Sequence, residues 1–323
     1  MVFSVAIIGL GKIGLEYDQF LSREEYVLSH SRAFYSHSGF YLVAGVDIVE
    51  EKRMSLRNFY GVKAYSCVEE LVKEVRPDVI VIANPTKEHY AAIKSILSYY
   101  NPIALLCEKP LAMTQEQSQA ILNICNKHCV PFYVNFIRRA DPGIKEIYKR
   151  INQKIIMPPY KAVIWYSKGV LHNGLHYIDL LTYWFGEIID FSIIDPGEKI
   201  SKFDAEPDFR LQFEQASAIF CAASESNFSH YTVEIIAANG RLFLEKDGNI
   251  SWQPVEENRI ISGYRQLQKS AECIPNRMAF YQLNITDELF MALNGMENSL
   301  CTGAQALKTQ SVVNEILTEV LVN

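Results

Sequence analysis

Short, continuous apolar runs alternate with helix-like stretches along the first part of the chain. The runs cover residues 3–8, 41–46, 79–83, 104–107 and 132–136. Strands of a parallel sheet are buried on both faces, so they carry continuous apolar runs rather than an alternating pattern. Two of the helix-like stretches open on a capping box, Ser66 to Glu69 and Thr114 to Gln117. The alternation predicts a doubly wound α/β domain of the Rossmann type over residues 1–136.

The pattern changes after Asp141-Pro142-Gly143. Helices are expected at residues 144–151, 174–185, 279–293 and 303–321, and strands at 160–167, 188–194, 209–213, 216–222, 232–237 and 241–244. Turn signals at Asn239-Gly240 and Asp247-Gly248 separate some of these strands. Residues 137–323 are therefore expected to form an α+β domain with a mainly antiparallel open sheet.

Composition narrows the class of protein. Hydrophobic residues make up 49% of the chain, charged residues 21%, and the formal net charge is −6. A mildly acidic protein without a Lys/Arg block is a poor partner for nucleic acid or an anionic membrane. No apolar run approaches the ~18 residues of a membrane span, and the N-terminus lacks the features of a signal peptide. The expectation is a cytoplasmic protein.

The seven cysteines are odd in number and contain no C-x-x-C spacing. Cys125 and Cys129 are four residues apart in a helical pattern, which would bring them together on one helix face. Two small core residues in a reducing cytosol are the favoured interpretation, and a redox or metal pair is the alternative.

A glycine-rich turn follows the first predicted strand directly. Its residues are Gly9, Leu10, Gly11, Lys12, Ile13 and Gly14. In a G-x-G-x-x-G turn the first glycine allows the tight strand-to-helix turn, the second lets the backbone approach a pyrophosphate, and the third allows close helix–strand packing. The helix start then offers free N–H groups to the phosphates. This turn predicts a dinucleotide site formed by Gly9, Gly11, Lys12, Ile13 and Gly14.

The second strand ends in Asp47. A carboxylate there accepts hydrogen bonds from ribose hydroxyls and repels a 2′-phosphate, which favours NAD. Lys52 and Arg53 leave NADP as the alternative. Asp47 lies 33 residues after Gly14, against about 20 in the usual motif. Residues 16–35 therefore hold an insertion, interpreted either as a cover for the site or as a surface elaboration.

The chain resembles the Gfo/Idh/MocA oxidoreductases over essentially its whole length. The resemblance rests on four segments: the glycine turn, Ala83-Asn84-Pro85-Thr86-Lys87-Glu88-His89, Glu108-Lys109-Pro110, and Gly174-Leu175-His176-Tyr177-Ile178-Asp179-Leu180. Residues 138–142 are similar to the segment that joins the family's two domains. The resemblance implies an NAD(P) enzyme with a sugar, cyclitol or sugar derivative between its domains. It also implies a second domain that serves substrate binding and assembly into dimers or tetramers.

The resemblance also implies roles for individual residues. Lys109 is the matching catalytic lysine, whose peptide bond to proline is often cis in the family, and an ammonium there stabilises negative charge on the reacting oxygen. His176 is the general acid/base, since its ordinary pKa lies near working pH. Asn84, Pro85, Thr86, His89 and Glu108 are expected at the cofactor, with helix capping or packing as an equal alternative for His89. Asn135, Arg138, Trp165, Lys168 and Asn173 are expected to border the nicotinamide or the substrate.

One position departs from the family pattern. The family usually has an aspartate four residues before the histidine, and this chain has His172. Three interpretations stay open: His172 shares the proton relay, it binds a substrate group such as a carboxylate or phosphate, or activity is lost. The His-x-x-x-His spacing also suits a metal, but no third ligand is evident in the sequence, so no metal is expected.

The function predicted from the sequence is hydride transfer between a nicotinamide cofactor and a CH–OH group of a sugar, cyclitol or sugar-nucleotide-like substrate. An inactive NAD(P)-binding regulator or scaffold is one alternative, favoured by the missing aspartate. A lyase or hydrolase that recycles its NAD is the other.

Overall fold

The computed structural model describes residues 1–322 and divides into two compact units. Unit 1 comprises Met1–Ala140 and Ala279–Gln310, and unit 2 comprises Asp141–Met278 and the residues from Ser311 onward. The expected boundary after residue 136 lies close to the first of these divisions. The return of Ala279–Gln310 to unit 1 was not predicted from the sequence.

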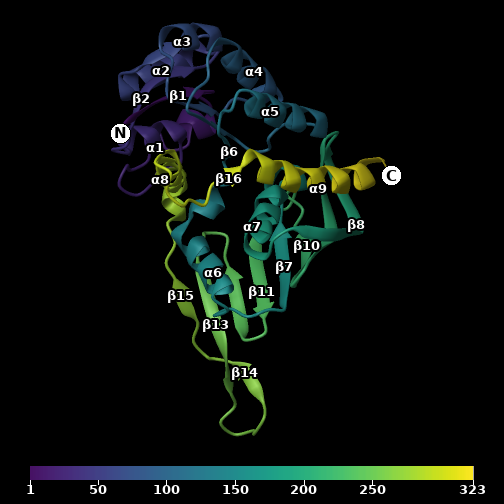
Figure 1. Cartoon of the computed structure of the whole chain (residues 1–323). Coiled ribbons are helices and arrows are strands. Elements are labelled where there is room, and N and C mark those ends of the chain that lie inside the picture. The colour runs from purple at the N-terminus through teal and green to yellow at the C-terminus, as the bar shows by residue number, and fades with distance from the viewer. Residues whose placement is uncertain (323) are drawn as a thin grey trace. The chain divides into compact units, whose positions relative to one another are not determined.

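Unit 1 is built on a seven-stranded sheet with the order β16-β6-β5-β4-β1-β2-β3. Figure 1 labels β1, β2, β6 and β16 of this sheet. Its strands are β1 (Phe3–Ile8), β2 (Phe40–Val46), β3 (Lys63–Tyr65), β4 (Val79–Ile82), β5 (Ala104–Cys107), β6 (Phe132–Val134) and β16 (Cys301–Thr302). All neighbouring pairs are parallel except β16 with β6. The sheet confirms the predicted doubly wound domain and adds β3 and β16, which are too short to give an apolar pattern.

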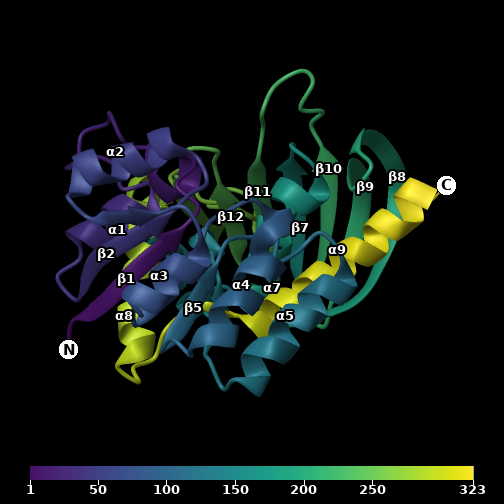
Figure 2. The same cartoon turned by 90° about the horizontal axis from the view of Figure 1, so that it is seen from above.

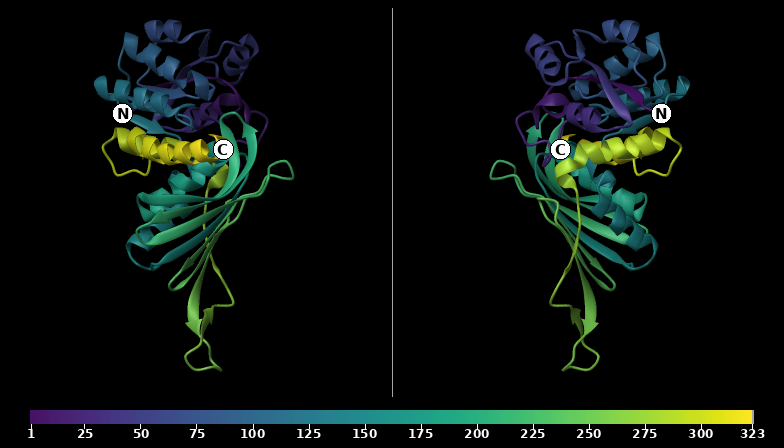
Figure 3. Two further views of the ribbon diagram at one scale, coloured as in Figure 1. Left: turned by 90° about the vertical axis from the view of Figure 1, so that its right-hand side faces the viewer. Right: turned by 90° about the vertical axis from the view of Figure 1, so that its left-hand side faces the viewer.

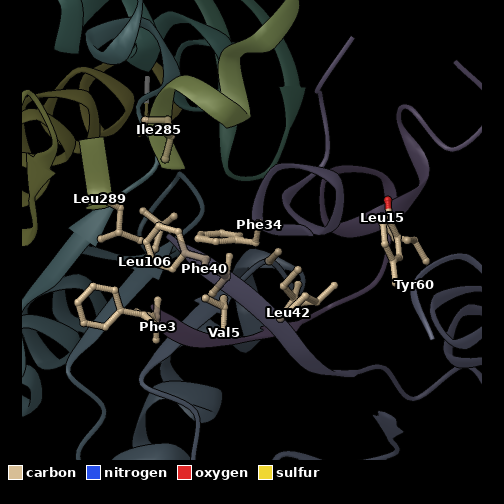
Figure 4. Packing of buried hydrophobic residues seen from close by; sticks show 14 of the residues in the cluster. Phe3, Val5, Leu15, Phe34, Phe40, Leu42, Tyr60, Leu106, Ile285 and Leu289 are labelled. Atoms are coloured by element: carbon tan, nitrogen blue, oxygen red, sulfur yellow. The ribbon is translucent and has the colours of Figure 1, made fainter. Parts of the chain in front are cut away.

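Helices cover the sheet of unit 1. They are α1 (His30–Ser36), α2 (Glu50–Tyr60), α3 (Val68–Glu74), α4 (His89–Tyr99), α5 (Gln115–Lys127) and α8 (Tyr281–Leu293), with short helical turns at Lys12–Glu16, Thr86–Glu88, Ile137–Ala140 and Met278–Phe280. One core joins strand residues such as Val5 and Leu106 to Phe34 of α1, Tyr60 of α2 and Leu289 of α8 (Figure 4). Helices α3, α4 and α5 lie side by side (Figure 2).

Unit 2 is built on a nine-stranded sheet with the order β14-β13-β12-β11-β7-β10-β9-β8 and β15 paired to β13. Figure 3 shows the strands of this sheet, coloured teal to green, from two sides. Its strands are β7 (Tyr160–Tyr166), β8 (Ile188–Ser201), β9 (Asp204–Phe213), β10 (Ala216–Ala222), β11 (Thr232–Ala237), β12 (Gly240–Leu244), β13 (Ile250–Glu257), β14 (Arg265–Leu267) and β15 (Glu272–Ile274). Among the described strands of unit 2, β7 and β10 pair in parallel and the other pairs are antiparallel. The predicted, mainly antiparallel sheet is therefore confirmed, with longer β8 and β9 than expected.

Helices α6 (Pro142–Asn152) and α7 (Leu175–Phe185) pack against this sheet, and α7 continues a helical turn at Val170–Gly174. Strand β7 alternates strictly between buried and exposed side chains. Tyr166, on its buried side, lies 3.4 Å from the position a Cβ on Gly174 would take. Lys161, Val163 and Trp165 therefore point to the opposite face. Helix α9 (Gly303–Val322) begins in unit 1 and ends in unit 2.

Two local predictions are wrong, the cap formed by Ser66 and the shared helix face of Cys125 and Cys129, because the helices begin or end at other residues than expected. Ser66 does not cap α3: Cys67 takes the N-cap position, and the Ser66 hydroxyl donates to Glu70 instead. Thr114 does cap α5, accepting from the Gln117 N–H. Cys125 and Cys129 do not share a helix face, because α5 ends at Lys127 and Cys129 adopts a left-handed φ of 53°. Cys125 is buried and Cys129 is exposed.

Candidate dinucleotide and substrate sites

The glycine turn of unit 1 has the geometry that its sequence predicts. Gly9 has a φ of +94°, and a Cβ there would lie 2.4 Å from the Asn84 nitrogen. A Cβ on Gly14 would lie 2.0 Å from the Gly9 carbonyl oxygen. At Gly11, by contrast, the nearest atom is Lys52 Nζ, 3.5 Å away at the end of a flexible side chain. Gly9 and Gly14 are therefore needed by the fold, whereas Gly11 leaves the open backbone approach that a pyrophosphate requires.

Asp47 holds this turn in place from the end of β2. Its Oδ2 accepts from the Leu10 N–H at 2.8 Å and its Oδ1 from the Val49 N–H at 2.9 Å. Arg53 donates to the Asp47 carbonyl oxygen at 2.6 Å and pairs with Glu50. The Arg53 guanidinium, one of the two groups that could have bound the 2′-phosphate of NADP, is thus already bonded to protein atoms. This supports NAD as the cofactor.

The helix after the glycine turn is shorter than expected. It spans only Lys12–Glu16, where Ile13 packs against the core and Lys12 is exposed. Helix α1 restarts at His30, and the Ser31 hydroxyl donates to the Gly14 carbonyl at 2.7 Å. Because this helix is only five residues long, its dipole is small, and the proposed phosphate contact falls mainly to the glycine backbone.

His89 links the loops that follow two neighbouring strands. Its Nε2 lies 2.9 Å from the Asn84 carbonyl oxygen, and its Nδ1 lies 3.1 Å from the Leu111 carbonyl and 3.4 Å from Cys107 Sγ. Burial lowers the pKa of His89, so the ring is neutral at pH 7. Because both nitrogens face protein atoms, His89 fixes the segment Asn84-Pro85-Thr86 rather than reaching a ligand. The Asn84 Oδ1 atom is buried and has no partner in the described part of the chain, so it is free for one.

Glu108 lies in a buried polar cluster beside Lys109. Its Oε1 accepts from Asn135 Nδ2 at 2.6 Å and lies 2.8 Å from His30 Nε2. Asn135 also donates to Gln282 Oε1 at 3.2 Å. Asn135 is only 1% exposed and donates to Glu108, but its Oδ1 atom has no partner in the described part of the chain, so its expected place at the nicotinamide or the substrate stays a prediction. His30 and Gln282 gave no sequence signal, because neither belongs to a motif.

Burial raises the pKa of Glu108, but the hydrogen bonds from His30 and Asn135 and the charge of Lys109 outweigh it, leaving a net pKa below the ordinary value. Glu108 is therefore ionised at neutral pH. The peptide bond between Lys109 and Pro110 is cis, as the family resemblance implies. Lys109 and Arg138 are both half-buried.

The histidine segment of unit 2 begins at a left-handed turn. Lys168 and Gly169 have positive φ values of 69° and 80°, and the helical turn Val170–Gly174 follows. His172 is exposed, whereas His176 is 8% exposed on α7. The two histidines differ in environment despite their i, i+4 spacing. Among residues 1–322, no group of three or more His, Cys, Asp or Glu side chains is arranged to hold a metal.

Two buried carboxylates of β9 hold this turn. Asp204 Oδ1 accepts from the Leu171 N–H at 3.0 Å, and its Oδ2 accepts from the His172 N–H at 3.2 Å. Glu206 accepts from the N–H groups of Gly169 at 3.3 Å and Glu225 at 3.0 Å. Position 172 lacks the aspartate of the family pattern, but two carboxylates from β9 lie against the same turn. The sequence pattern did not reveal them.

The remaining expected substrate residues are separated by the fold. Asn173 donates to the Ser167 carbonyl at 3.0 Å, and Lys168 Nζ lies 3.8 Å from Glu225 Oε1. Both belong to the turn that carries His172. Trp165 is 43% exposed on the other face of β7, so the structure does not place it with His172 as predicted.

Replacing Asp204 tests the electrostatics of this turn. Burial raises the pKa of Asp204 from 3.8 to about 6. The native state holds this proton where the unfolded state has released it, so the stabilising contribution is full below pH 3.8 and is lost as the pH rises through 6. Relative to Asp204→Asn, the wild type should lose about 3 kcal/mol between pH 3 and pH 8.

Denaturant unfolding at several pH values measures that difference. Asp190→Asn, which removes an exposed carboxylate from β8, controls for the loss of one negative charge. A stability difference between wild type and Asp204→Asn that stays constant with pH would contradict the raised pKa.

Comparison with known proteins agrees with the geometry of both units. Residues 3–136 match the family described as oxidoreductase family, NAD-binding Rossmann fold. The rhizopine catabolism protein MocA of Rhizobium meliloti is 24% identical over 145 residues, which are 45% of this chain and 41% of that protein. Myo-inositol 2-dehydrogenase of Thermotoga maritima is 23% identical over 264 residues, 75% of each chain. The chain thus spans less than half of the first relative and three quarters of the second.

A solved structure shows the same fold over the full length. It is an oxidoreductase from Agrobacterium radiobacter in complex with NAD+, L-tartaric acid and magnesium, with a TM-score of 0.75 and 15% identity, covering 100% of this chain and 97% of that one. In residues 1–322, none of the helices combines the length and apolarity that membrane crossing demands.

Proposed function

We propose that the chain, whose residues 3–136 match the NAD-binding oxidoreductase family, is a Gfo/Idh/MocA enzyme that oxidises a CH–OH group of a neutral cyclitol or sugar. The observation that carries the proposal is the open glycine turn at Gly11 together with Lys109 after β5. The name of the Thermotoga relative supports the cyclitol class.

The dinucleotide half of the proposal rests on unit 1. Gly9, Gly11 and Gly14 shape the turn for the pyrophosphate, and the Lys12 and Ile13 backbone lies between them. Asp47 has oxygen lone pairs left for ribose hydroxyls, Asn84 Oδ1 is unpaired, and Pro85, Thr86 and Glu108 adjoin the same strand ends. When bound, NAD supplies the hydride acceptor for the oxidation.

The chain's own residues handle the proton and the charge. The Lys109 ammonium donates a hydrogen bond to the reacting oxygen and stabilises its negative charge. His176 accepts the hydroxyl proton as general base. Arg138 is kept as a substrate contact on the family resemblance alone. His172 keeps its two active interpretations, in the proton relay or at a substrate group.

The carboxylates around the His172 turn support an uncharged substrate. Asp204, Glu206 and Glu225 all lie against residues 167–172. Negative potential at this turn repels a phosphate or carboxylate and tolerates hydroxyl groups, which donate hydrogen bonds to carboxylates. The interpretation of His172 as an anion-binding residue is therefore the weaker of the two.

A substrate panel tests the function. Purified protein with NAD is mixed with cyclitols, aldoses and their uronic acids, and the increase in NADH absorbance is measured together with the products. Turnover of a neutral polyol supports the proposal. NAD binding without NADH or any product supports a regulator, and a product without net NADH supports the NAD-recycling alternative.

We also propose a homodimer or homotetramer assembled through the open face of the unit 2 sheet. Four apolar side chains on three adjacent strands of this face are 37–48% exposed: Val163, Trp165, Ile219 and Ile236. The family resemblance suggests this use of the face. The cytoplasm stays the proposed compartment, because seven free cysteines suit a reducing environment.

Replacing Ile236 by glutamate should dissociate this assembly, because a buried unpaired charge costs several kcal/mol at an interface. The molar mass of wild type and Ile236→Glu is measured by light scattering after gel filtration. Ile260→Glu, at a side chain 93% exposed in the turn between β13 and β14, is the matched control. A wild-type monomer, or a variant with an unchanged oligomeric mass, contradicts the proposal.

A further inference from the structure

The insertion after the glycine turn is held by a buried ion pair. Asp18 is 0% exposed and Arg32 is 3% exposed. Asp18 accepts from the N–H groups of Leu28 at 2.6 Å and Ser29 at 2.8 Å, and from the Ser29 hydroxyl at 2.6 Å. Arg32 donates to carbonyl oxygens of the insertion, those of Leu21 and Tyr26 each at 3.1 Å. The insertion is therefore an ordered element and not a loose surface loop.

This arrangement decides where α1 begins. The Ser29 side chain caps α1 by accepting from the Arg32 N–H, so the Asp18 contacts fix the residue that precedes His30. Val27 also bonds to the turn before α8 and to α8 itself. Its N–H donates to the Ala279 carbonyl at 2.9 Å, and its carbonyl accepts from the Gln282 N–H at 3.3 Å. The insertion thus fixes both His30 and Gln282.

These two residues meet at the buried polar cluster around Glu108. His30 is 1% exposed, stacks on Phe34 and lies 2.8 Å from Glu108 Oε1 through Nε2. Gln282 is 0% exposed and accepts from Asn135, which in turn donates to Glu108. A carboxylate buried at 12% exposure needs such donors, since an ion without them is expensive to hold away from water.

From these contacts we propose that the insertion serves the proposed reaction by delivering His30 as a positioning residue for Glu108, which in turn sets the place and charge of its neighbour Lys109. The inference rests on the proposed function of Lys109. His30 touches neither substrate nor cofactor in this proposal. It donates from Nε2 to Glu108, and the fixed carboxylate keeps the adjoining ammonium protonated and oriented.

Three variants at position 30 separate a hydrogen-bonding role from a packing role. His30→Phe keeps a ring against Phe34 but has no donor. His30→Gln places an amide N–H at a reach similar to Nε2. His30→Asn keeps polarity but is too short to reach Glu108, and it replaces His30→Phe should that protein not fold. His37→Gln is the matched control at the other end of α1, where His37 pairs with Asp287 at 3.3 Å.

The first readout does not depend on turnover. Acylation of Lys109 by acetic anhydride at pH 7.5 is measured by peptide mass spectrometry relative to the exposed Lys87. Glu108→Gln should raise this ratio at least about threefold, because loss of the carboxylate lowers the pKa of the ammonium. His30→Phe should raise it in the same direction, since Glu108 takes up a proton more readily with one donor fewer. His30→Gln should return it to the wild-type value.

The second readout uses the polyol that the substrate panel identifies. His30→Phe should lower kcat at least about tenfold while NAD affinity, measured by calorimetry, stays within about twofold of wild type. Glu108→Gln should lower kcat similarly, and the double variant should be no slower than the worse single one, since the two residues act as one unit. His30→Gln should keep most of the activity, which a merely space-filling role does not explain.

The outcomes separate this inference from the proposed function. Unchanged Lys109 acylation and unchanged kcat in folded His30→Phe overturn the inference and leave the function standing. A wild type without turnover, combined with altered Lys109 acylation in His30→Phe, removes the function and leaves the positioning contact standing. Failure of His30→Gln to restore either readout also overturns the inference, because the hydrogen bond would then not be the cause.

Discussion

Replacement of Lys109 by methionine is expected to lower the kcat of NAD-linked polyol oxidation at least about 100-fold. Methionine keeps much of the aliphatic stem of lysine and removes the ammonium that stabilises charge on the reacting oxygen, an effect of about 10²–10³ in comparable sites. The peptide backbone at Lys109-Pro110 is untouched, so NAD affinity should stay within about twofold. NADH formation gives kcat, and calorimetry gives the NAD affinity.

Lys87→Met is the control, because Lys87 is 74% exposed and adjoins the same dinucleotide half of unit 1. It should retain wild-type kcat. Near-normal turnover in Lys109→Met would show that the reacting oxygen takes its stabilisation from another group, and the assignment of Lys109 would have to be given up.

A Gly11→Ala substitution is expected to weaken NAD binding at least about tenfold, or 1.4 kcal/mol, without a change in thermal stability. Gly11 has a φ of −76°, which alanine adopts freely, and the added methyl group meets only Lys52 Nζ at 3.5 Å. The methyl group would instead occupy the space through which the pyrophosphate approaches the backbone. Calorimetric titration with NAD and a thermal melt measure the two effects.

Gly14→Ala gives the opposite outcome and is the matched comparison. Its Cβ would lie 2.0 Å from the Gly9 carbonyl oxygen, so unit 1 has to shift before any ligand is present, and the melting temperature should fall. If Gly11→Ala binds NAD as tightly as wild type, the phosphates do not pass over Gly11 and the proposed placement is wrong.

The contrast between Gly11 and Gly14 shows which structural features a sequence motif can predict. The sequence identifies three glycines with three assigned roles. The structure shows that Gly9 and Gly14 have no room for a side chain, whereas the role of Gly11 at a pyrophosphate stays a prediction. It does not predict that the following helix stops at Glu16, because the residues that restart it, Asp18 and Ser29, act through contacts across the insertion. Neither residue carries a recognisable pattern.

The candidate site divides in the same way. Lys109 and His176 are identified from local motifs, whereas His30, Gln282, Asp204 and Glu206 are found only from their contacts. For Trp165, by contrast, the sequence predicted a place at the substrate that the structure does not support. Trp165 lies close to His172 in the chain, but the two-residue period of β7 turns it to the opposite face.

By itself, the sequence determined the alternating fold of residues 1–136, the antiparallel character of the second part, the glycine turn and the lysine and histidine of the proposed chemistry. The fold and the glycine turn depend on neighbours within a few residues, where hydrophobic period and backbone sterics act directly. The lysine and the histidine were identified from short motifs that resemble those of the family. Only the tertiary structure decided which buried groups surround Lys109 and His172. Glu108 meets His30 across 78 positions, and Asp204 meets His172 across 32. Such contacts follow from chain packing, which no local pattern encodes.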